Sequence, residues 1–290
     1  MSFALSKTEV IEEVKSYFTS SDQWRRLVSA LQEPDPQNAH IHLYLRNSIH
    51  PKSLEEIVRG YFEIMGWPIS RKIDWLGPDP VKMAFHGVLP EGKVNTDIFW
   101  FFDPLVGVRP AEGGEEGSNL LIWGKHYMDA YYKKFPFREV SLDDKKALGV
   151  YFNSSHWQDG LSLVVEPDTV HLHINVESSI HPDEIKRYAL ESLEAQGWKV
   201  DYVSPNVYHV REVIRGKLVF LCREPEKIFD IGWKFNPEVV IKPASEPWIH
   251  PEVGYDRWTK KRFLEQVMYR PFVELSSSEI QDILQTIRQQ

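Results

Sequence analysis

The feature that most constrains this chain is an internal repeat. Residues 40–51, HIHLYLRNSIHP, return 131 positions later as HLHINVESSIHP at 171–182, with six of the twelve positions identical. Three further blocks recur in the same order: 17–24 with 151–157, 33–35 with 166–168, and 136–144 with 271–279. Blocks that recur in order at a nearly constant offset indicate two copies of one structural unit. We therefore predict an internal tandem duplication.

Helix start signals mark the limits of the copies. A Ser followed three residues later by an acid, the capping-box spacing, occurs at Ser6, Ser141 and Ser276. We predict a first repeat over 1–140, a second over 141–275, and a C-terminal capping helix over 276–290. No body follows the third signal, so we expect this last helix to close the second repeat.

The pattern within each copy predicts an α-ββ-α-βββ unit. The hairpins are expected at 24–32 with 39–46 and at 160–166 with 170–177, because 159–168 is led by Gly and rich in β-branched residues. Helices are expected over 51–65 and 182–196, beginning at a Pro that follows an N-cap His (His50, His181) and ending at Gly66 and Gly197. Three strands follow in copy one and four in copy two. Short connections favour antiparallel neighbours, so the predicted class is α+β, with antiparallel sheets, helices packed on one face and a pseudo-twofold axis.

Composition excludes several classes of protein. A net charge of −8 argues against nucleic acid as a partner. The single Cys222 excludes an intrachain disulfide. The acidic N-terminal segment is unlike a secretory signal, and no run reaches the roughly 18 apolar residues of a membrane span. We therefore expect a soluble cytoplasmic protein with no membrane insertion and no cofactor.

The repeated histidines are the candidate site. Residues two apart on a strand share a face, so each repeated strand has an aliphatic side and a polar side. The polar sides carry His40, His42, Tyr44 and Arg46 in copy one, and His171, His173, Asn175 and Glu177 in copy two.

Three interpretations of these histidines stay open: structural groups, a composite recognition surface, or a metal or catalytic site with His171 and His173 as ligands. HLHINVE at 171–177 resembles the first metal motif of the cupins, although copy one has Arg46 at the acidic position. The duplicated strands also resemble those of two-histidine phosphoesterases, which implies a pair of general acid–base histidines. That family has Ser or Thr where His42 and His173 stand.

No phosphate-loop, dinucleotide, nucleophile-elbow or zincin motif is present. Aromatic residues make up 13% of the chain, with 10 Trp, a composition that suits interfaces. The preferred hypothesis is a non-catalytic assembly factor, chaperone or adaptor that grips a protein partner. Its groove would lie between the two halves, lined by the polar strand faces with Trp24 and Trp157 at the rim. The alternative is a metal-dependent or two-histidine-type hydrolase.

Overall fold

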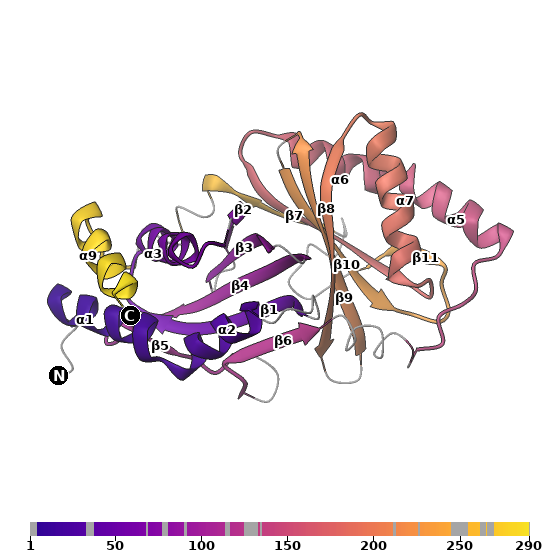
Figure 1. Ribbon diagram of the computed structural model, residues 1–290. Helices are drawn as coiled ribbons and strands as arrows, with labels where there is room; N and C mark the ends of the chain where they lie inside the picture. Colours follow the sequence, from indigo (N-terminus) through magenta and orange to yellow (C-terminus); the bar gives the residue numbers. More distant parts are fainter. Residues whose placement is uncertain are drawn as a thin grey trace. The chain divides into compact units, whose positions relative to one another are not determined.

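The computed structural model describes residues 5–32, 38–67, 69–76, 81–89, 92–113, 117–124, 133, 135–210, 213–225, 227–244, 255–261, 265 and 270–289. The chain divides into two compact units (Figure 1). The first combines Met1–Lys125 with Leu264–Gln290, and the second is His126–Phe263. Both contain helices and a mixed sheet, so the fold is α+β.

The first unit is a six-stranded sheet with helices from both ends of the chain. Its strands run in the order β2-β3-β4-β1-β5, and β6 also pairs with β1. The elements are α1 (Lys7–Ser20), α2 (Asp22–Gln32), β1 (Asn38–Asn47), α3 (Pro51–Ile64), β2 (Ile69–Leu76), β3 (Val81–Leu89), β4 (Gly92–Phe102), β5 (Val108–Pro110), β6 (Leu120–Gly124) and α9 (Ser277–Arg288).

The second unit has the strand order β11-β7-β10-β9-β8, with β12 also paired to β7. Its elements are α5 (Leu142–Phe152), α6 (Ser155–Val165), β7 (Thr169–Ser178), α7 (Pro182–Ala195), β8 (Lys199–Val210), β9 (Val213–Glu224), β10 (Lys227–Phe235), β11 (Ile241–Pro243) and β12 (Tyr255–Thr259). None of the described helices in either unit is long and apolar enough to cross a membrane.

The predicted hairpins were wrong. Residues 24–32 and 160–166 lie in helices α2 and α6, not in strands. The buried side of α6 is formed by Trp157, Gly160, Leu161 and Val164, at the i, i+3, i+4, i+7 spacing of a helix. A Cβ on Gly160 would lie 2.9 Å from Ile174 of β7, so glycine allows α6 to approach the sheet closely. Packing of this apolar side decides the structure over the β propensity of the valines.

The prediction of purely antiparallel sheets was also wrong. The central pair of each sheet is parallel, β1 with β4 and β7 with β10. These strands are not consecutive in the chain, because a helix and two strands separate them, and such a crossover permits parallel pairing. The other ladders are antiparallel.

The predicted ends of α3 and α7 are confirmed. Their N-caps are His50 and His181, whose Nδ1 atoms accept hydrogen bonds of 3.2 Å from backbone N–H groups two residues on. Past their C-terminal ends, Gly66 and Gly197 have φ of 74° and 79°. That left-handed conformation strains other residues and explains the glycines.

The His50 cap makes the stability of α3 depend on pH. Burial, the largest influence, lowers the pKa of His50 below its ordinary 6.5; the Lys52 charge acts in the same direction and the Glu274 charge opposes it. The neutral ring is the hydrogen-bond acceptor, so its stabilisation is present above pH 6.5 and is lost as pH falls through the folded-state pKa. Asparagine at position 50 can cap the helix without titrating. We therefore expect His50→Asn to lose about 1 kcal/mol less stability than the wild type when the pH is lowered. The measurement is urea unfolding of both proteins above and below pH 6.5. Equal acid sensitivity in both proteins would contradict this.

The prediction that the C-terminal helix closes the second repeat was wrong. Helix α9 packs against α1 and α3 of the first unit instead (Figure 1). Its buried side is Ile280, Ile283, Leu284 and Ile287. The segment before it is held by Val273, whose N–H donates to Ser48 O at 2.8 Å and whose carbonyl accepts from the His50 N–H at 3.0 Å. The chain therefore returns to complete its first unit.

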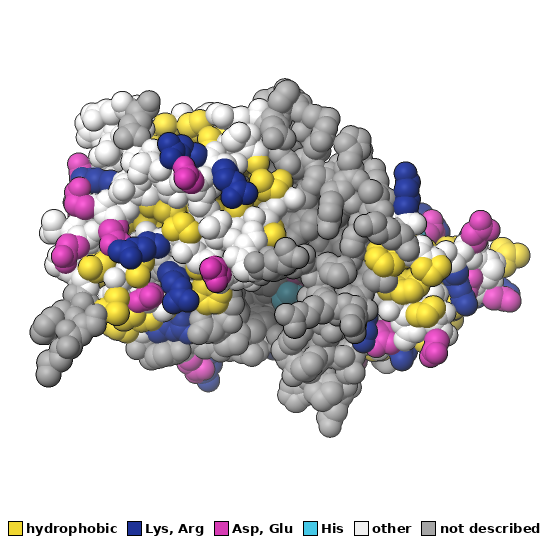
Figure 2. All heavy atoms as spheres, turned by 90° about the horizontal axis from the view of Figure 1, so that it is seen from below, with side chains coloured by type: hydrophobic (Ala, Val, Ile, Leu, Met, Phe, Trp, Pro, Cys, Tyr) yellow, Lys and Arg dark blue, Asp and Glu magenta, His cyan; other side chains and the backbone are white. Residues whose placement is uncertain are grey.

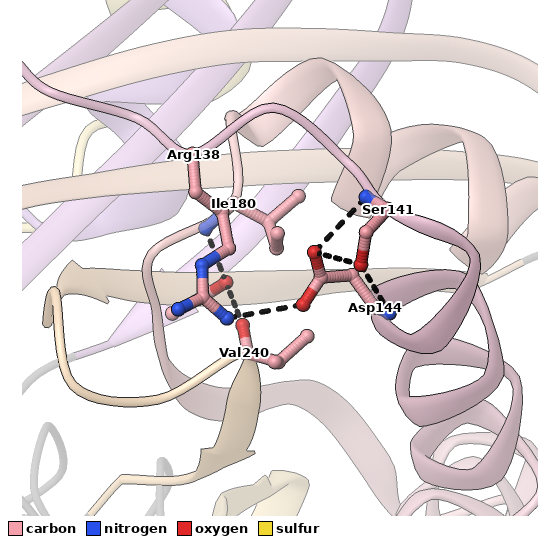
Figure 3. Close-up of polar contacts among 6 residues, drawn as sticks. Arg138, Ser141, Asp144, Ile180 and Val240 are labelled. Atoms are coloured by element: carbon pink, nitrogen blue, oxygen red, sulfur yellow. Dashed lines mark hydrogen bonds and ion pairs between the residues drawn. The ribbon is translucent and has the colours of Figure 1, made fainter.

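The second unit holds its own lead-in segment in a similar way. The Arg138 N–H donates to Ser179 O at 3.1 Å, next to the N-cap His181. The Arg138 side chain reaches forward to Asp144, whose carboxylate also accepts from Ser141 in a capping box (Figure 3). Beside them, Ser178 links the Ile180 N–H to the Val240 carbonyl. The contacts of Asp144 with Arg138 and Ser141 fix the start of α5.

Side chains on α3 explain why α9 packs on the first unit. A Cβ on Gly60 would lie 2.4 Å from the Leu284 side chain, so any larger residue at position 60 would force Leu284 to shift. The residue 131 positions on is Glu191 of α7, which forms an ion pair of 2.9 Å with Arg187. That surface of α7 is charged, and it would lose hydration under an apolar helix.

An ion pair of 2.7 Å between Lys7 and Glu279 joins α1 to the start of α9. The hydrogen bond from Lys7, followed by those from Ser276, lowers the pKa of Glu279 to about 2. The carboxylate therefore stabilises the fold above its ordinary pKa of 4.5, and that contribution is lost as pH falls toward 2. In Lys7→Ala we expect the pKa of Glu279 to rise toward 4.5 in a carbon-13 NMR titration. Lys15→Ala, which removes the ion pair to Asp282 instead, is the control; an unchanged Glu279 in Lys7→Ala would contradict the assignment.

Candidate functional site: a histidine–aspartate pair in each sheet

In the first sheet, His42 of β1 lies in register with Asp97 of the parallel strand β4. The two atoms His42 Nε2 and Asp97 Oδ2 are 3.1 Å apart, and both side chains are only 1% exposed. The Tyr44 hydroxyl lies 3.3 Å from Nδ1 of the same ring. Both ring nitrogens therefore face protein groups, and the imidazole is fixed between a carboxylate and a phenol.

Aromatic rings cover this first pair. Tyr44 stacks on Phe99 with ring centroids 5.0 Å apart and planes 11° from parallel. Phe99 also contacts the His42 ring at 4.9 Å. A Cβ on Gly113 would lie 2.4 Å from the Tyr44 ring, so the loop after β5 packs closely over it. The buried pair is thus inaccessible to a substrate. Its geometry fits a structural role.

In the second sheet, His173 of β7 lies in register with Asp230 of β10. His173 Nδ1 and Asp230 Oδ2 are 3.4 Å apart, and the carboxylate is fully buried. Here, however, the histidine side chain is 25% exposed. The same pairing of residues is therefore reachable from outside the second unit.

The difference in exposure follows from the next pair along the strands. Two residues after each histidine, Tyr44 faces Phe99 in the first sheet, whereas Asn175 faces Gly232 in the second. An amide and a hydrogen atom replace two aromatic rings. Asn175 lies over Gly232, since a Cβ there would come within 2.2 Å of Asn175 Oδ1.

A buried carboxylate beside an imidazole suits two kinds of chemistry. It orients the ring for hydrogen bonding to a ligand, and it is also the arrangement that orients a general base. A metal site would need more ligands. Among the residues that the structure describes, no three His, Cys, Asp or Glu side chains are grouped to hold a metal ion.

The remaining predicted site residues fall into separate places. The Arg46 side chain is 56% exposed, and its Nη1 lies 3.8 Å from Asp103 Oδ2. Partial burial raises the pKa of Glu177, but hydrogen bonds from Asn236 and Lys242 outweigh it, so the net pKa of this carboxyl is below its ordinary value. His40 and His171 belong to β1 and β7 by their backbone; their side chains lie outside the described part of the chain.

Trp24 and Trp157 are core residues, 1% and 0% exposed, and so cannot line the surface groove predicted for them. Trp24 packs edge-on against Phe18 and Tyr61, at 4.5 and 5.1 Å. Trp157 donates a 2.9 Å hydrogen bond to Ser192 Oγ. They anchor α2 and α6.

The sequence analysis missed both aspartates. They lie in a repeat that it did not use, Asp-Ile-x-Trp-x-Phe at 97–102 and again at 230–235. Alternation on a strand places the Asp on the side opposite Ile, and the Ile and Trp are buried in both copies. The available signal was an aspartate that occurs in both copies at the same place in a largely apolar strand.

Exposed apolar side chains are dispersed among the described residues. The large ones are Leu105, Ile122, Leu142, Val150 and Val165. On the face drawn in Figure 2, hydrophobic side chains alternate with Lys, Arg, Asp and Glu.

Comparison with known proteins gives weak structural similarities. A glyoxalase family protein from Bacillus cereus aligns over 67% of this chain and 93% of its own, at 9% identity and a TM-score of 0.15. A glyoxalase I variant from Zea mays aligns over 67% and 44%, at 12% identity and 0.15. An uncharacterized Shigella flexneri protein aligns over 78% and 62%, at 12% identity and 0.18. No protein-family model matches the sequence, and the comparison with curated proteins gave no match. Scores this low establish neither a shared fold nor a shared chemistry.

Proposed function

We propose that the chain is an internal duplication of one α+β unit. Support comes from the sequence repeat and from the matching strand orders, with one parallel pair at the centre of each sheet. The histidine–aspartate pair occurs at that parallel pair in both units. Duplicated units that keep one residue pair and change its neighbours are free to take different roles.

We further propose that the protein is a non-catalytic binding protein that recognises a protein partner. The observation that carries this is the contrast between the sealed pair at His42 and the exposed pair at His173. The first unit acts as a scaffold. The second presents an oriented imidazole beside Asn175 and Gly232, a polar feature suited to recognition. The predicted groove between the two halves stays a prediction.

The test is co-purification followed by reconstitution. Tagged protein is recovered from native extract, retained proteins are identified by mass spectrometry, and the leading candidate is purified separately. We expect a stoichiometric complex from the two purified proteins in calorimetry, with hydrogen exchange slowed along β7 and β10. If no retained protein rebinds in purified form, the binding function is rejected.

A second candidate function is a hydrolase with His173 as its general base. The 25% exposure of a ring held by the fully buried Asp230 favours it. The test is turnover of a panel of phosphodiesters and carboxylic esters by wild type and His173→Gln. Activity abolished in this variant but kept in Arg25→Ala, a change at an exposed side chain of α2, would support it. Absence of turnover, or turnover that survives His173→Gln, would exclude it.

A further inference from the structure

The segments that lead into α5 and α9 share a sequence. Helix α5 follows PFREVS at 136–141, and α9 follows PFVELS at 271–276, so only the third and fifth positions differ. Each segment ends in the serine of a capping box. The other helix with a capping box, α1, follows MSFALS at 1–6, which lacks this sequence. The chain therefore has two Pro-Phe-x-Glu segments and two units.

In the first unit, the Phe272 ring lies between two other rings. It is edge-on to the N-cap His50 and to Phe102 at the end of β4, with ring centroids 5.7 and 4.8 Å apart. The next residue pairs through its backbone, since the Val273 N–H donates to Ser48 O at 2.8 Å. Backbone hydrogen bonds and a side chain held in a pocket are also what bind an extended peptide to a folded domain.

The second unit holds its segment by matching contacts. The Phe137 ring is edge-on to the N-cap His181 and to Phe235 at the end of β10, at 4.9 and 5.4 Å. The next residue, Arg138, donates its N–H to Ser179 O at 3.1 Å. Each unit therefore has a site for this segment, made of an N-cap histidine, a phenylalanine at the end of a strand and a serine carbonyl.

The two segments reach their sites from opposite directions along the chain. Residues 136–141 lead into the second unit, whereas 271–276 come after the whole second unit and return to the first. The contacts match in spite of this difference. The sequence of the segment therefore determines binding, and the way in which the segment is connected to the unit does not.

We propose that the site in the first unit also binds the C-terminal segment of a second copy of the chain, so that two copies join by exchange of 271–288. A second copy supplies the same groups, including Glu279 and Asp282, which pair with Lys7 and Lys15 at 2.7 Å. Tethering favours the chain's own segment at low concentration, because it raises the local concentration of that segment. Exchange is expected where the chain's own segment is disabled. The histidine–aspartate pairs take no part in this exchange, which goes beyond the proposed function.

The experiment mixes two full-length variants, each of which lacks one half of the contact. Phe272→Ala with Ile283→Ala disables the segment and leaves its site intact. Gly60→Glu disables the site and leaves the segment intact, because it places a charge where Leu284 packs; Glu191 is the corresponding residue of α7. We expect an equimolar complex by light scattering. Hydrogen exchange in α3 of the isotope-labelled segment variant is expected to slow by about tenfold or more on mixing.

The segment variant mixed with more of itself is the control, for which we expect no complex and no slowing in α3. A mixture of the two variants that stays monomeric, with α3 exchanging as fast as in the segment variant alone, would overturn the proposal.

If either variant aggregates, the deciding measurement uses the wild-type chain with a protease site inserted before residue 270 and cut after folding. The cut protein should take up a fluorescent peptide of residues 271–290. A Phe272→Ala peptide should compete about tenfold more weakly, as expected for loss of an aromatic anchor. A Gln285→Ala peptide, changed on the exposed side of α9, should compete equally. No uptake, or equal competition by the Phe272→Ala peptide, would overturn the proposal.

Discussion

Replacing Ile283 of α9 with alanine is expected to lower the free energy of unfolding of the first unit by about 2–5 kcal/mol. This side chain is 0% exposed and belongs to the side of α9 that packs on α1 and α3. Removing it leaves a cavity in a contact that joins the two ends of the chain. The measurement is urea denaturation, followed by hydrogen exchange of amides in α3 to assign the change to the first unit.

The control is Gln285→Ala, on the exposed side of the same helix, for which we expect a change within about 0.5 kcal/mol. A chain that ends at residue 270 should lose the whole contact and show free exchange in α1 and α3. Protection of α3 in that truncated chain would show that the first unit is stable without α9, and the prediction would be wrong.

Replacing His42 with alanine is expected to lower the free energy of unfolding by about 3–5 kcal/mol, because it removes the imidazole that lies 3.1 Å from the buried Asp97 carboxylate. Asp97 is 1% exposed, so its carboxylate is not solvated from the surface and depends on groups within the protein. The double variant His42→Ala with Asp97→Ala should cost less than the sum of the two single changes, by about 0.5–3 kcal/mol. The four proteins are compared by urea denaturation at neutral pH.

Strict additivity would contradict the pairing of His42 with Asp97. Tyr44→Phe is a useful companion, because it removes the hydroxyl near Nδ1 and keeps the ring stacked on Phe99. We expect its cost to be near 1 kcal/mol, as for one hydrogen bond. A loss as large as that of His42→Ala would mean that the phenol, rather than the carboxylate, holds the ring.

Local signals allowed much of the fold to be predicted. The starts of α1, α5 and α9 follow from serine capping boxes, and the ends of α3 and α7 follow from Gly66 and Gly197. These features depend on neighbours within a few residues, so a sequence displays them directly. The strand pairing of β1 with β4 joins segments more than 50 residues apart, and no local rule specifies it.

Only part of the candidate site could be predicted from the sequence. The repeated histidines were clear, but their exposure depends on Phe99 and Gly232, which come from strands far along the chain. The error at α2 and α6 came from reading valines as strand formers when Trp157, Leu161 and Val164 already had helical spacing. Tertiary packing, which a propensity does not contain, decided both points.

The return of α9 to the first unit also bears on the order of events during synthesis. The second unit, residues 126–263, leaves the ribosome before the segment 264–290 that the first unit requires. Domains generally fold as units in order of synthesis. Synthesis of the first unit therefore begins first and ends last. The apolar surface of α1 and α3 stays exposed while the entire second unit is synthesised. That interval is when a nascent chain of this kind has most need of a chaperone.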